Sequence, residues 1–349
     1  MTATMTPSSC ASLMAAEAAE AAAAVRRQTA ASADLFAALG RRLRASPPPF
    51  VVTCARGSSD HACSYGKYLI ETVAGRVVAS VGPSVASVYQ RRLAMRGALF
   101  IAVSQSGRSP DLLRLTEAAR AEGALVVGFV NDPEAPLAAL CEMVIPLAAG
   151  PERSVAATKS CLASMAAFLH LVAGWSEQPG VLAQLHALPA ALEAACGLDW
   201  FPALRPLVGA GGLYVVGRGP ALGVAAEMAL KCKETCRLHA EAFSAAELIH
   251  GPLELVRDGF PVLALAQPDA AAAQTRQVLE RLVALGGQVF TTAPDMAGTV
   301  ALPVVDGMAA EVMPLLALQS FYLAASRLAR ARGLDPDAPS SLQKVTRTV

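Results

Sequence analysis

The sequence predicts an α/β fold in which two doubly wound parallel sheets, related by internal duplication, precede a C-terminal tail. Three observations predict this fold. Short apolar runs recur in two sets of four, a glycine turn follows the first run of each set, and helical patterns separate the runs. Each run of the second set lies about 160 residues after its counterpart, and a repeated spacing of this kind is typical of duplicated units.

The apolar runs have the length of strands and the continuous hydrophobicity of strands that are buried on both faces of a parallel sheet. They are Phe50–Cys54, Ala98–Val103, Leu125–Val130 and Met143–Pro146, followed by Leu213–Val216, Pro261–Leu265, Gln288–Thr292 and Val300–Val304. Segments such as Asp111–Glu122 and Ala273–Leu285 have the apolar periodicity of helices. The alternation of strand and helix therefore predicts helices on both faces of each sheet.

The length of 349 residues exceeds one typical domain and predicts two. We expect an N-terminal helical segment at residues 1–34, a first α/β subdomain at 35–176, a second at 177–333 and a tail at 334–349. With 54% hydrophobic and 16% charged residues, the chain has enough apolar surface for two large cores.

Composition also excludes several classes of partner. A formal net charge of +1 provides no overall field to hold nucleic acid. No run approaches the ~18 apolar residues of a membrane helix, and the N-terminus lacks a signal-peptide pattern. None of the eight cysteines belongs to a zinc-type pair. We therefore expect a cytoplasmic protein with no nucleic-acid or membrane partner and no metal.

Two serine-rich turns follow strands of the first half, where the carboxyl ends of parallel strands form a ligand crevice. One turn contains Ser58 and Ser59, and the other runs through Ser104, Gln105, Ser106 and Ser109. Hydroxyls and backbone N–H groups at helix starts can hold a phosphate, so the pattern favours a sugar phosphate. Ordinary helix capping by Ser109 is the alternative.

The second glycine turn, Gly217-Arg218-Gly219, lacks the spacing of a dinucleotide-binding loop. No acidic residue ends the next strand to bind a ribose. We therefore predict a tight turn here and no organic cofactor.

The densest polar cluster follows, between Glu227 and His250. Glu227, Lys231 and Glu234 share one face of a helix that is otherwise largely apolar. A solvated row of ion pairs is the usual meaning of such a pattern, but the apolar surroundings favour a site. His250 precedes Gly251-Pro252, and a histidine near carboxylates and a lysine indicates acid–base chemistry.

Taken together, these motifs resemble the sugar isomerase (SIS) family. The motifs are Gly57-Ser58-Ser59, Ser104-Gln105-Ser106-Gly107, Ser154–Lys159, Glu227-x3-Lys231-x2-Glu234, His239–Phe243 and Glu247-x2-His250-Gly251-Pro252. They are similar in particular to the isomerase half of glucosamine-6-phosphate synthase. The resemblance runs from about residue 35 to the C-terminus, where Leu342-Gln343-Lys344 is similar to that family's lysine loop. It implies that the two subdomains are SIS subdomains and that the tail is a lid.

The resemblance also implies roles for individual residues. The serines of both turns and Gln105 would hold the phosphate and sugar hydroxyls, and Val155 and Ala157 would line the sugar pocket. Glu234 would move a proton between C1 and C2, with Lys231 assisting. His250, supported by Glu227, would open the sugar ring from a neighbouring subunit, which implies a homodimer with a shared active site. Lys344 would close the site and could form an imine with the open-chain ketose.

Departures from the synthase pattern bear on the reaction. The chain begins Met1-Thr2 rather than with a nucleophilic cysteine, so we expect no glutaminase domain. Arg56, Arg108, Ser154 and Ala157 also depart from the synthase pattern, and the whole set resembles stand-alone SIS-type glucosamine-6-phosphate deaminases. The expected reaction is glucosamine 6-phosphate plus water giving fructose 6-phosphate and ammonia.

Three alternatives stay open. The first is an ammonia-dependent synthase that runs the same equilibrium forwards. The second is a deaminase of another substrate, such as galactosamine 6-phosphate or a fructosamine 6-phosphate. The third is a sugar-phosphate-sensing regulator, which would need the serine turns but not Glu234, His250 and Lys344.

Overall fold

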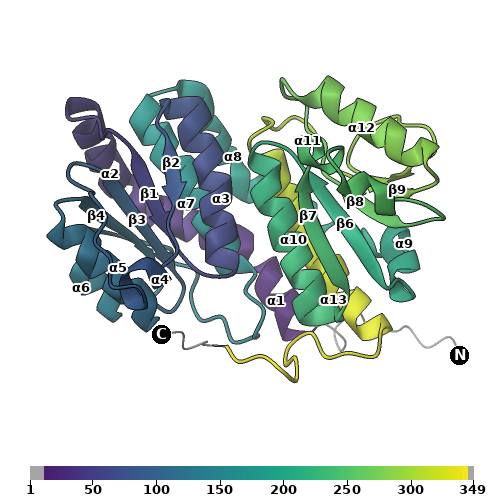
Figure 1. Cartoon of the computed structure of the whole chain (residues 1–349), viewed down its shortest axis with the longest axis horizontal. Helices are drawn as coiled ribbons and strands as arrows, with labels where there is room; N and C mark the ends of the chain where they lie inside the picture. The colour runs from purple at the N-terminus through teal and green to yellow at the C-terminus, as the bar shows by residue number, and fades with distance from the viewer. Residues whose placement is uncertain (1–11, 345–349) are drawn as a thin grey trace, which may run out of the picture.

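The computed structural model describes residues 12–344. Parts of the expected N-terminal segment and tail, residues 1–11 with Cys10 and residues 345–349, lie outside the described residues. Two parallel five-stranded sheets stand side by side, each in its own half of the molecule (Figure 1). The predicted α/β fold with two duplicated sheets is thereby confirmed.

The first sheet has the strand order β2-β1-β3-β4-β5. Its strands are β1 Val51–Cys54, β2 Val78–Ser80, β3 Leu99–Ser104, β4 Leu125–Val130 and β5 Met143–Pro146. The second sheet has the order β10-β9-β8-β6-β7, which is the same arrangement written from the other edge. Its strands are β6 Gly212–Gly217, β7 His239–Ser244, β8 Pro261–Ala264, β9 Gln288–Thr291 and β10 Val300–Ala301.

The sequence prediction missed β2 and β7, which are the outer partners of β1 and β6. It also made the last strand too long. The run expected over Val300–Val304 forms a strand only at Val300 and Ala301. Leu302 still donates its backbone N–H to the carbonyl of Thr291 in β9. Pro303 comes next, and a proline lacks the N–H that continued pairing would need.

A matched pair of glycines supports the internal duplication. Gly57 (φ 55°, ψ −132°) precedes the first helix after β1, and Gly219 (φ 58°, ψ −134°) precedes the first helix after β6. Residues with a side chain rarely adopt this conformation. Both halves therefore turn from their first strand into their first helix by the same backbone geometry.

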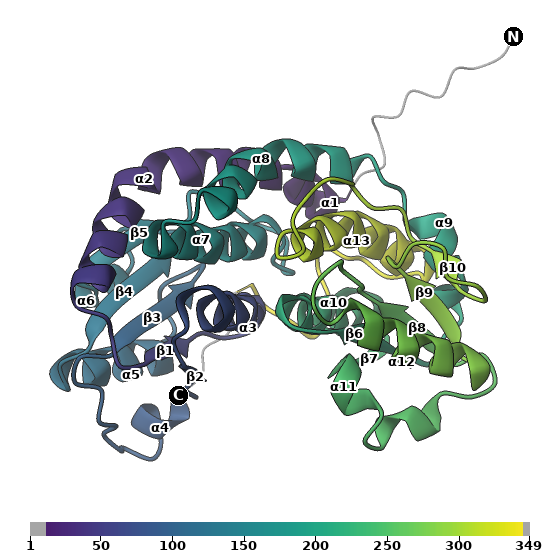
Figure 2. The ribbon, with the colours of Figure 1, turned by 90° about the horizontal axis from the view of Figure 1, so that it is seen from above.

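The long helices form the layers around the sheets (Figure 2). They are α2 Ala21–Ala45, α3 Ser58–Leu69, α5 Pro110–Ala121, α7 Lys159–Ser176, α8 Pro179–Cys196, α10 Pro220–Cys236, α12 Ala272–Ala284 and α13 Met313–Ala331. Helix α2 packs on α7, and α13 packs on both α8 and α10. Helix α2 continues across the boundary expected between residues 34 and 35, and the proposed subdomain limits stay a prediction.

Short helices complete the chain. They are α1 Leu13–Ala19, α4 Ser84–Ser87, α6 Pro136–Leu140, α9 Phe201–Leu204 and α11 Ala245–Leu248, with a π-helix at Ile70–Ala74 and 3₁₀ turns at Arg205–Val208 and Pro252–Leu255. Seven cysteines lie in the described part of the chain, none in a disulfide, and five of them are buried.

The two halves meet where α3 packs against α10. Gly223 of α10 makes this approach possible, because a Cβ there would lie 2.5 Å from the backbone N of Tyr65 and 2.7 Å from the backbone O of His61. One hydrophobic core continues across this contact and includes residues of both sheets. The halves are therefore joined by direct helix packing.

We expect Gly223→Ala to lower the free energy of unfolding by about 2 kcal/mol, because the added methyl group must push two helix backbones apart. Chemical denaturation of the purified variant measures the change. Gly180→Ala in α8 is the control, because a Cβ there meets nothing within 4 Å. Equal stability of the two variants would contradict the close helix contact.

No single helix among the described residues is long and apolar enough to cross a membrane. The consecutive segments Pro179–Cys196 and Phe201–Val208 pass the length and composition criteria together, but they bend by 59° where they meet.

Candidate active site

A cavity of about 350 Å³ opens at the carboxyl ends of β1 and β3. In this strand order, β1 and β3 are the neighbours from which the chain continues in opposite directions, so a crevice forms between their ends. The cavity is lined by Arg56, Gly57, Ser58, Ser59, Val103, Ser104, Gln105, Ser106, Ser109, Leu112, Val155, Ala157, Ser160, Lys231, Glu234, Leu342, Gln343 and Lys344. The structure thus brings all eight predicted substrate-binding residues into one cavity, together with three of the five predicted catalytic residues.

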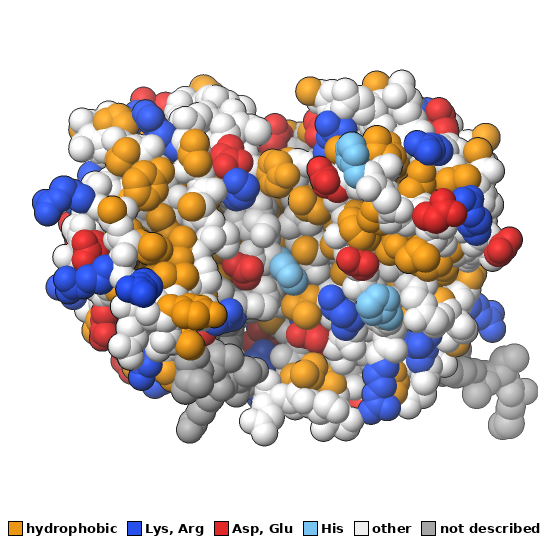
Figure 3. Space-filling model, viewed as in Figure 1, with side chains coloured by type: hydrophobic (Ala, Val, Ile, Leu, Met, Phe, Trp, Pro, Cys, Tyr) orange, Lys and Arg blue, Asp and Glu red, His pale blue; other side chains and the backbone are white. Residues whose placement is uncertain are grey.

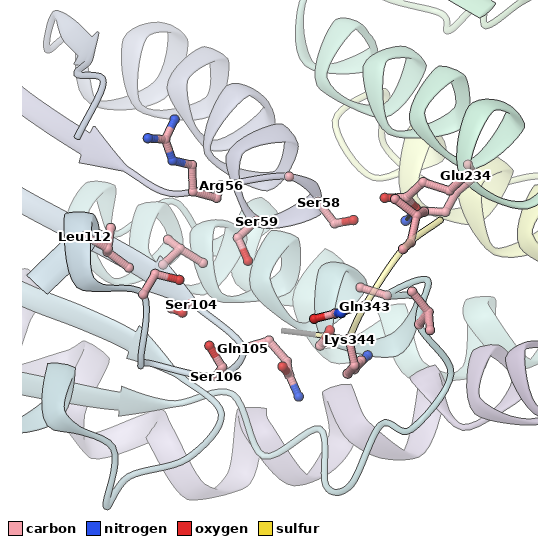
Figure 4. A pocket seen from close by; sticks show the side chains of 18 residues that line it. Arg56, Ser58, Ser59, Ser104, Gln105, Ser106, Leu112, Glu234, Gln343 and Lys344 are labelled. Atoms are coloured by element: carbon pink, nitrogen blue, oxygen red, sulfur yellow. Dashed lines mark hydrogen bonds and ion pairs between the residues drawn. The ribbon is translucent and has the colours of Figure 1, made fainter. Parts of the chain in front are cut away.

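Ser104 and Ser106 lie at the end of the cavity away from Glu234, Ser59 lies beside them, and Ser58 lies between this group and Glu234 (Figure 4). Ser58 and Ser59 open helix α3, and Ser109 stands at the N-cap of α5. The side chain of Ser109 makes no capping hydrogen bond to any residue that the structure describes, so simple helix capping does not explain it. Two helix N-termini and a group of hydroxyls therefore face the same space, an arrangement that suits an anion.

The Ser104–Ser109 loop is shaped by its own side chains. The backbone N–H of Gly107 donates to Ser104 Oγ at 2.9 Å, and that of Arg108 donates to Ser106 Oγ at 3.4 Å. Arg108 itself turns outward to pair with Asp132 at 2.9 Å. These bonds hold the loop in a turn at the mouth of the crevice.

Arg56 lines the cavity, but its guanidinium points away from Ser104 and Ser106 (Figure 4). Its Nε and Nη2 donate to Asp111 Oδ2 at 3.0 and 2.6 Å. Asp111 is fully buried in the first turn of α5. This ion pair ties the start of α3 to the start of α5, the two helix ends that frame the serines.

The opposite end of the cavity is formed by helix α10, where Lys231 pairs with Glu234. Glu227, one turn earlier, lies 3.5 Å from Lys231 Nζ, and both of these side chains are fully buried. Burial opposes the charge on Lys231, yet the carboxylates of Glu227 and Glu234 hold its pKa above the ordinary value. The predicted helical face therefore forms a buried charged row that reaches the cavity at Glu234.

Glu227 does not line the cavity and receives hydrogen bonds from two other elements. His61 Nδ1 lies 3.0 Å from Glu227 Oε2, and Tyr322 Oη donates to Glu227 Oε1 at 2.9 Å. Burial would raise the pKa of Glu227, but Lys231, His61 and Tyr322 offset it, so the pKa lies below the ordinary value. Neither His61 nor Tyr322 belongs to a motif of the sequence, so neither was expected at this site.

His250 lies on an exposed turn after α11 and is not among the described residues that line the cavity. Its backbone N–H donates to the carbonyl of Glu247, which lies in the short helix α11 of the same chain. The carboxylate of Glu227 is bonded to His61 and Tyr322 instead. A single chain therefore does not bring His250 to the other predicted catalytic residues.

The floor of the cavity is a loop before α7 that contains Val155 and Ala157 and is organised by Glu152. This buried carboxylate accepts the backbone N–H groups of Thr158 and Ser160 at 3.0 and 3.1 Å and the Ser160 hydroxyl at 2.6 Å. Lys344 of the C-terminal tail donates to it at 3.2 Å. Glu152 thus links the loop of residues 152–158 to Lys344 of the tail, a link that the sequence did not reveal.

Glu152 predicts a pH-dependent stability. Burial raises its pKa, but Lys344 and the donors of Ser160 and Thr158 outweigh burial and lower it below 4.5. A carboxylate whose pKa is lower in the folded protein than in the unfolded chain stabilises the protein fully at any pH above its unfolded-state pKa. This stabilisation is lost as the pH falls through the folded-state pKa. We expect Glu152→Gln to be less stable than the parent at pH 7, with the difference shrinking towards pH 3. Thermal unfolding at both pH values measures this, and a constant difference would contradict it.

The N-terminal helix α1 braces the same loop. Glu17 accepts the backbone N–H groups of Arg153 and Ser154 at 2.6 and 3.1 Å. The N–H of Val155 donates to the carbonyl of Asp337, whose carboxylate caps the first two residues of α1. The first and last described segments of the chain therefore meet beneath the loop of residues 152–158.

In the equivalent position of the second half, between β6 and β8, a buried glutamine lies at the carboxyl ends of the strands. Gln267 is nearly fully buried there and donates to the carbonyl of Arg218 at 3.1 Å and to Asp269 Oδ2 at 3.1 Å. The Gly217-Arg218-Gly219 segment leads directly into α10, as expected for a tight turn. Between residues 12 and 344, no group of three His, Cys, Asp or Glu side chains is arranged to hold a metal ion.

The SIS domain pattern matches residues 50–173 and 207–292. Glutamine–fructose-6-phosphate aminotransferase (isomerizing) of Gloeobacter violaceus is 34% identical over 339 residues, which cover 90% of this chain and 52% of that protein. The chain thus spans about half the length of the aminotransferases that it matches.

Two solved structures extend the comparison. A candidate phosphosugar isomerase from Silicibacter pomeroyi DSS-3 is 44% identical with a TM-score of 0.89, covering 94% of this chain and 100% of that one. The glucosamine-6-phosphate deaminase of Thermotoga maritima has a TM-score of 0.72 at 18% identity, covering 93% and 100% of the two chains. The second likeness concerns the fold alone.

Proposed function

Because the chain belongs to the SIS domain family, we propose that it is an isomerising deaminase that converts glucosamine 6-phosphate and water into fructose 6-phosphate and ammonia. The chain is related to phosphosugar isomerases and to the isomerase half of the aminotransferases. The single observation that carries the proposal is the convergence of the serine turns, Glu234 and Lys344 in one cavity.

The proposed binding follows from the two ends of this cavity. The phosphate would occupy the serine end, where hydroxyls and the N-termini of α3 and α5 provide hydrogen-bond donors. The open-chain sugar would then extend towards α10 and the tail. Its C1 and C2 carbons would lie beside Glu234 and Lys344, while Val155 and Ala157 would contact the sugar along its length.

The proposed chemistry needs one base at that position. Once the ring is open, Glu234 takes the proton from C2 and returns it to C1, which turns the 2-amino aldehyde into a 2-imino sugar through an enaminol. Water then adds to C2, the C–N bond breaks, and ammonia leaves as the ketone forms. The Lys231 ammonium, paired with Glu234, would balance the charge that develops on the enaminol oxygen.

Ring opening requires a proton at the ring oxygen, and we propose that His250 of a second copy provides it. His250 is exposed on its own chain, and Ile249 and Leu255 beside it are exposed hydrophobic residues, 42% and 64% accessible. Hydrophobic side chains are also exposed over both halves on the face shown in Figure 3. Such surfaces often mark contacts between subunits, so the expected homodimer with a shared site stays part of the proposal. A cytoplasmic location likewise stays a prediction.

A second candidate is the reverse reaction, amination of fructose 6-phosphate by free ammonia. The specific observation in its favour is that relatives 30 to 35% identical over this chain are glutamine–fructose-6-phosphate aminotransferases. Both candidates use the same cavity and the same base.

Ammonia release from the purified protein tests the proposal, with glucosamine, galactosamine and N-acetylglucosamine 6-phosphates compared side by side. Ammonia and fructose 6-phosphate from glucosamine 6-phosphate alone would support the deaminase. Glucosamine 6-phosphate formed from fructose 6-phosphate and ammonium, with little release, would support the second candidate. Binding of a sugar phosphate without turnover in either direction would overturn both and favour a sensor.

A further inference from the structure

His61 is a polar residue near the site that the proposed reaction leaves without a task. It lies on α3, one turn after Ser58, and its side chain is 22% exposed. Its Nδ1 lies 3.0 Å from Oε2 of Glu227, 166 residues later in the sequence. An ionised carboxylate can only accept a hydrogen bond, so Nδ1 is the protonated nitrogen and donates. His61 thus connects the helix that opens the serine end of the cavity to the helix that holds the proposed base.

The two carboxylate oxygens of Glu227 are satisfied by a small number of donors. Oε2 accepts from His61, and Oε1 accepts from Tyr322 at 2.9 Å and lies 3.5 Å from Lys231 Nζ. A fully buried carboxylate without donors is costly, so each of these contacts matters to it. Lys231 meanwhile lies closer to Glu234 than to Glu227.

We infer that His61 is a positioning residue: by satisfying Glu227, it leaves Lys231 paired with Glu234 and so holds Glu234 beside the reacting carbons. This inference rests on the proposed role of Glu234 as the base. It assigns His61 no contact with substrate. The assignment follows from the order of contacts from His61 to Glu227, from Glu227 to Lys231 and from Lys231 to Glu234.

Glu227 and Glu234 compete for the ammonium group of Lys231, and this competition explains how the loss of His61 would displace Glu234. If His61 stops donating, Glu227 has a buried oxygen without a partner, and Lys231 is the nearest cation that can replace the lost donor. Lys231 then moves towards Glu227 and away from Glu234. The side chain of Glu234 is 23% exposed, so without its ion pair to Lys231 it is free to rotate away from the reacting carbons. A displacement of about 1 Å at a reacting group costs on the order of 100-fold in rate.

Three variants test the inference by kinetics. His61→Phe removes the donor, whereas His61→Asn keeps an N–H at the position of Nδ1. We expect kcat to fall about 100-fold in His61→Phe with KM changed less than about threefold, and to recover to within about fivefold of the parent in His61→Asn. Tyr65→Phe is the matched control, because Tyr65 lies on the same helix and crosses to the second half but donates only to the carbonyl of Glu311. It should keep the parental kcat.

A crystal structure of His61→Phe provides a readout that needs no turnover. We expect Lys231 Nζ to lie closer to Glu227 than to Glu234, the reverse of the order in the parent. A Lys231–Glu234 pair unchanged in His61→Phe would overturn the inference, as would a kcat equal to that of Tyr65→Phe. If the parent converts no aminosugar phosphate, the proposed function fails by itself, and the lysine position still decides whether His61 positions this row.

Discussion

Glutamine in place of Glu234 is expected to reduce ammonia release by about 1,000-fold or more while sugar-phosphate binding stays intact. The amide has the shape of the carboxylate but cannot take a proton from C2. Ser104 and Ser106, which would hold the phosphate, lie at the other end of the cavity, so the variant should still bind. Initial rates with glucosamine 6-phosphate measure the first effect, and titration calorimetry measures the second.

The control for this experiment is Glu280→Gln. Glu280 is an exposed carboxylate of α12 that pairs with Arg276 outside the cavity, so its loss should leave both rate and affinity unchanged. Retained turnover in Glu234→Gln would remove Glu234 from the role of base. Lost binding together with lost stability would instead indicate that the Lys231–Glu234 pair supports the cavity itself.

Two inactive variants are expected to restore activity when mixed, if His250 acts across a dimer interface. His250→Asn and Glu234→Gln should each be nearly inactive alone. In a mixed dimer, one site combines the intact Glu234 of one copy with the intact His250 of the other. Random pairing makes half of the dimers mixed, and each has one intact site of two, so roughly a quarter of the parental activity should return.

The mixture must be refolded or co-expressed so that subunits exchange, and the mass of the assembly must be measured by light scattering. Each variant treated alone in the same way is the control. A monomeric protein with full activity would contradict the shared site. So would a dimer whose mixed variants stay inactive, since His250 would then act, if at all, within its own chain.

The sequence was sufficient for strands that are continuous apolar runs, including the edge strand β5, and insufficient for strands that are polar on one face or only three residues long. Strands β1 and β3 are continuous apolar runs, with every residue buried. In β7, exposed His239 and Glu241 alternate with buried Ala240, a pattern that resembles a polar segment. Strand β2 has only three residues, one of them buried. Both were missed because a half-exposed strand carries too weak a hydrophobic signal to distinguish it from a loop.

The residues of the candidate site also fall into two groups, those that local motifs predict and those that only tertiary packing brings together. Ser58, Ser104 and Glu234 belong to local motifs, and the cavity that contains them was expected from those motifs. His61, Glu152 and Tyr322 were not, because their partners are set by tertiary packing between distant segments. The bond between Lys344 and Glu152 spans 192 positions, and no local spacing predicts it.

The backbone contact at Gly223 bears on how a substrate would enter. Helices α3 and α10 are in backbone contact there, so a swing of one half away from the other would break this contact and expose the core that continues across it. The substrate would then enter, and the product leave, by movement of the tail residues that line the cavity, which are Leu342, Gln343 and Lys344. Structures with and without a bound sugar phosphate should superimpose on both halves at once, with the displacement confined to the tail. Product release would accordingly be timed by a few residues rather than by domain motion.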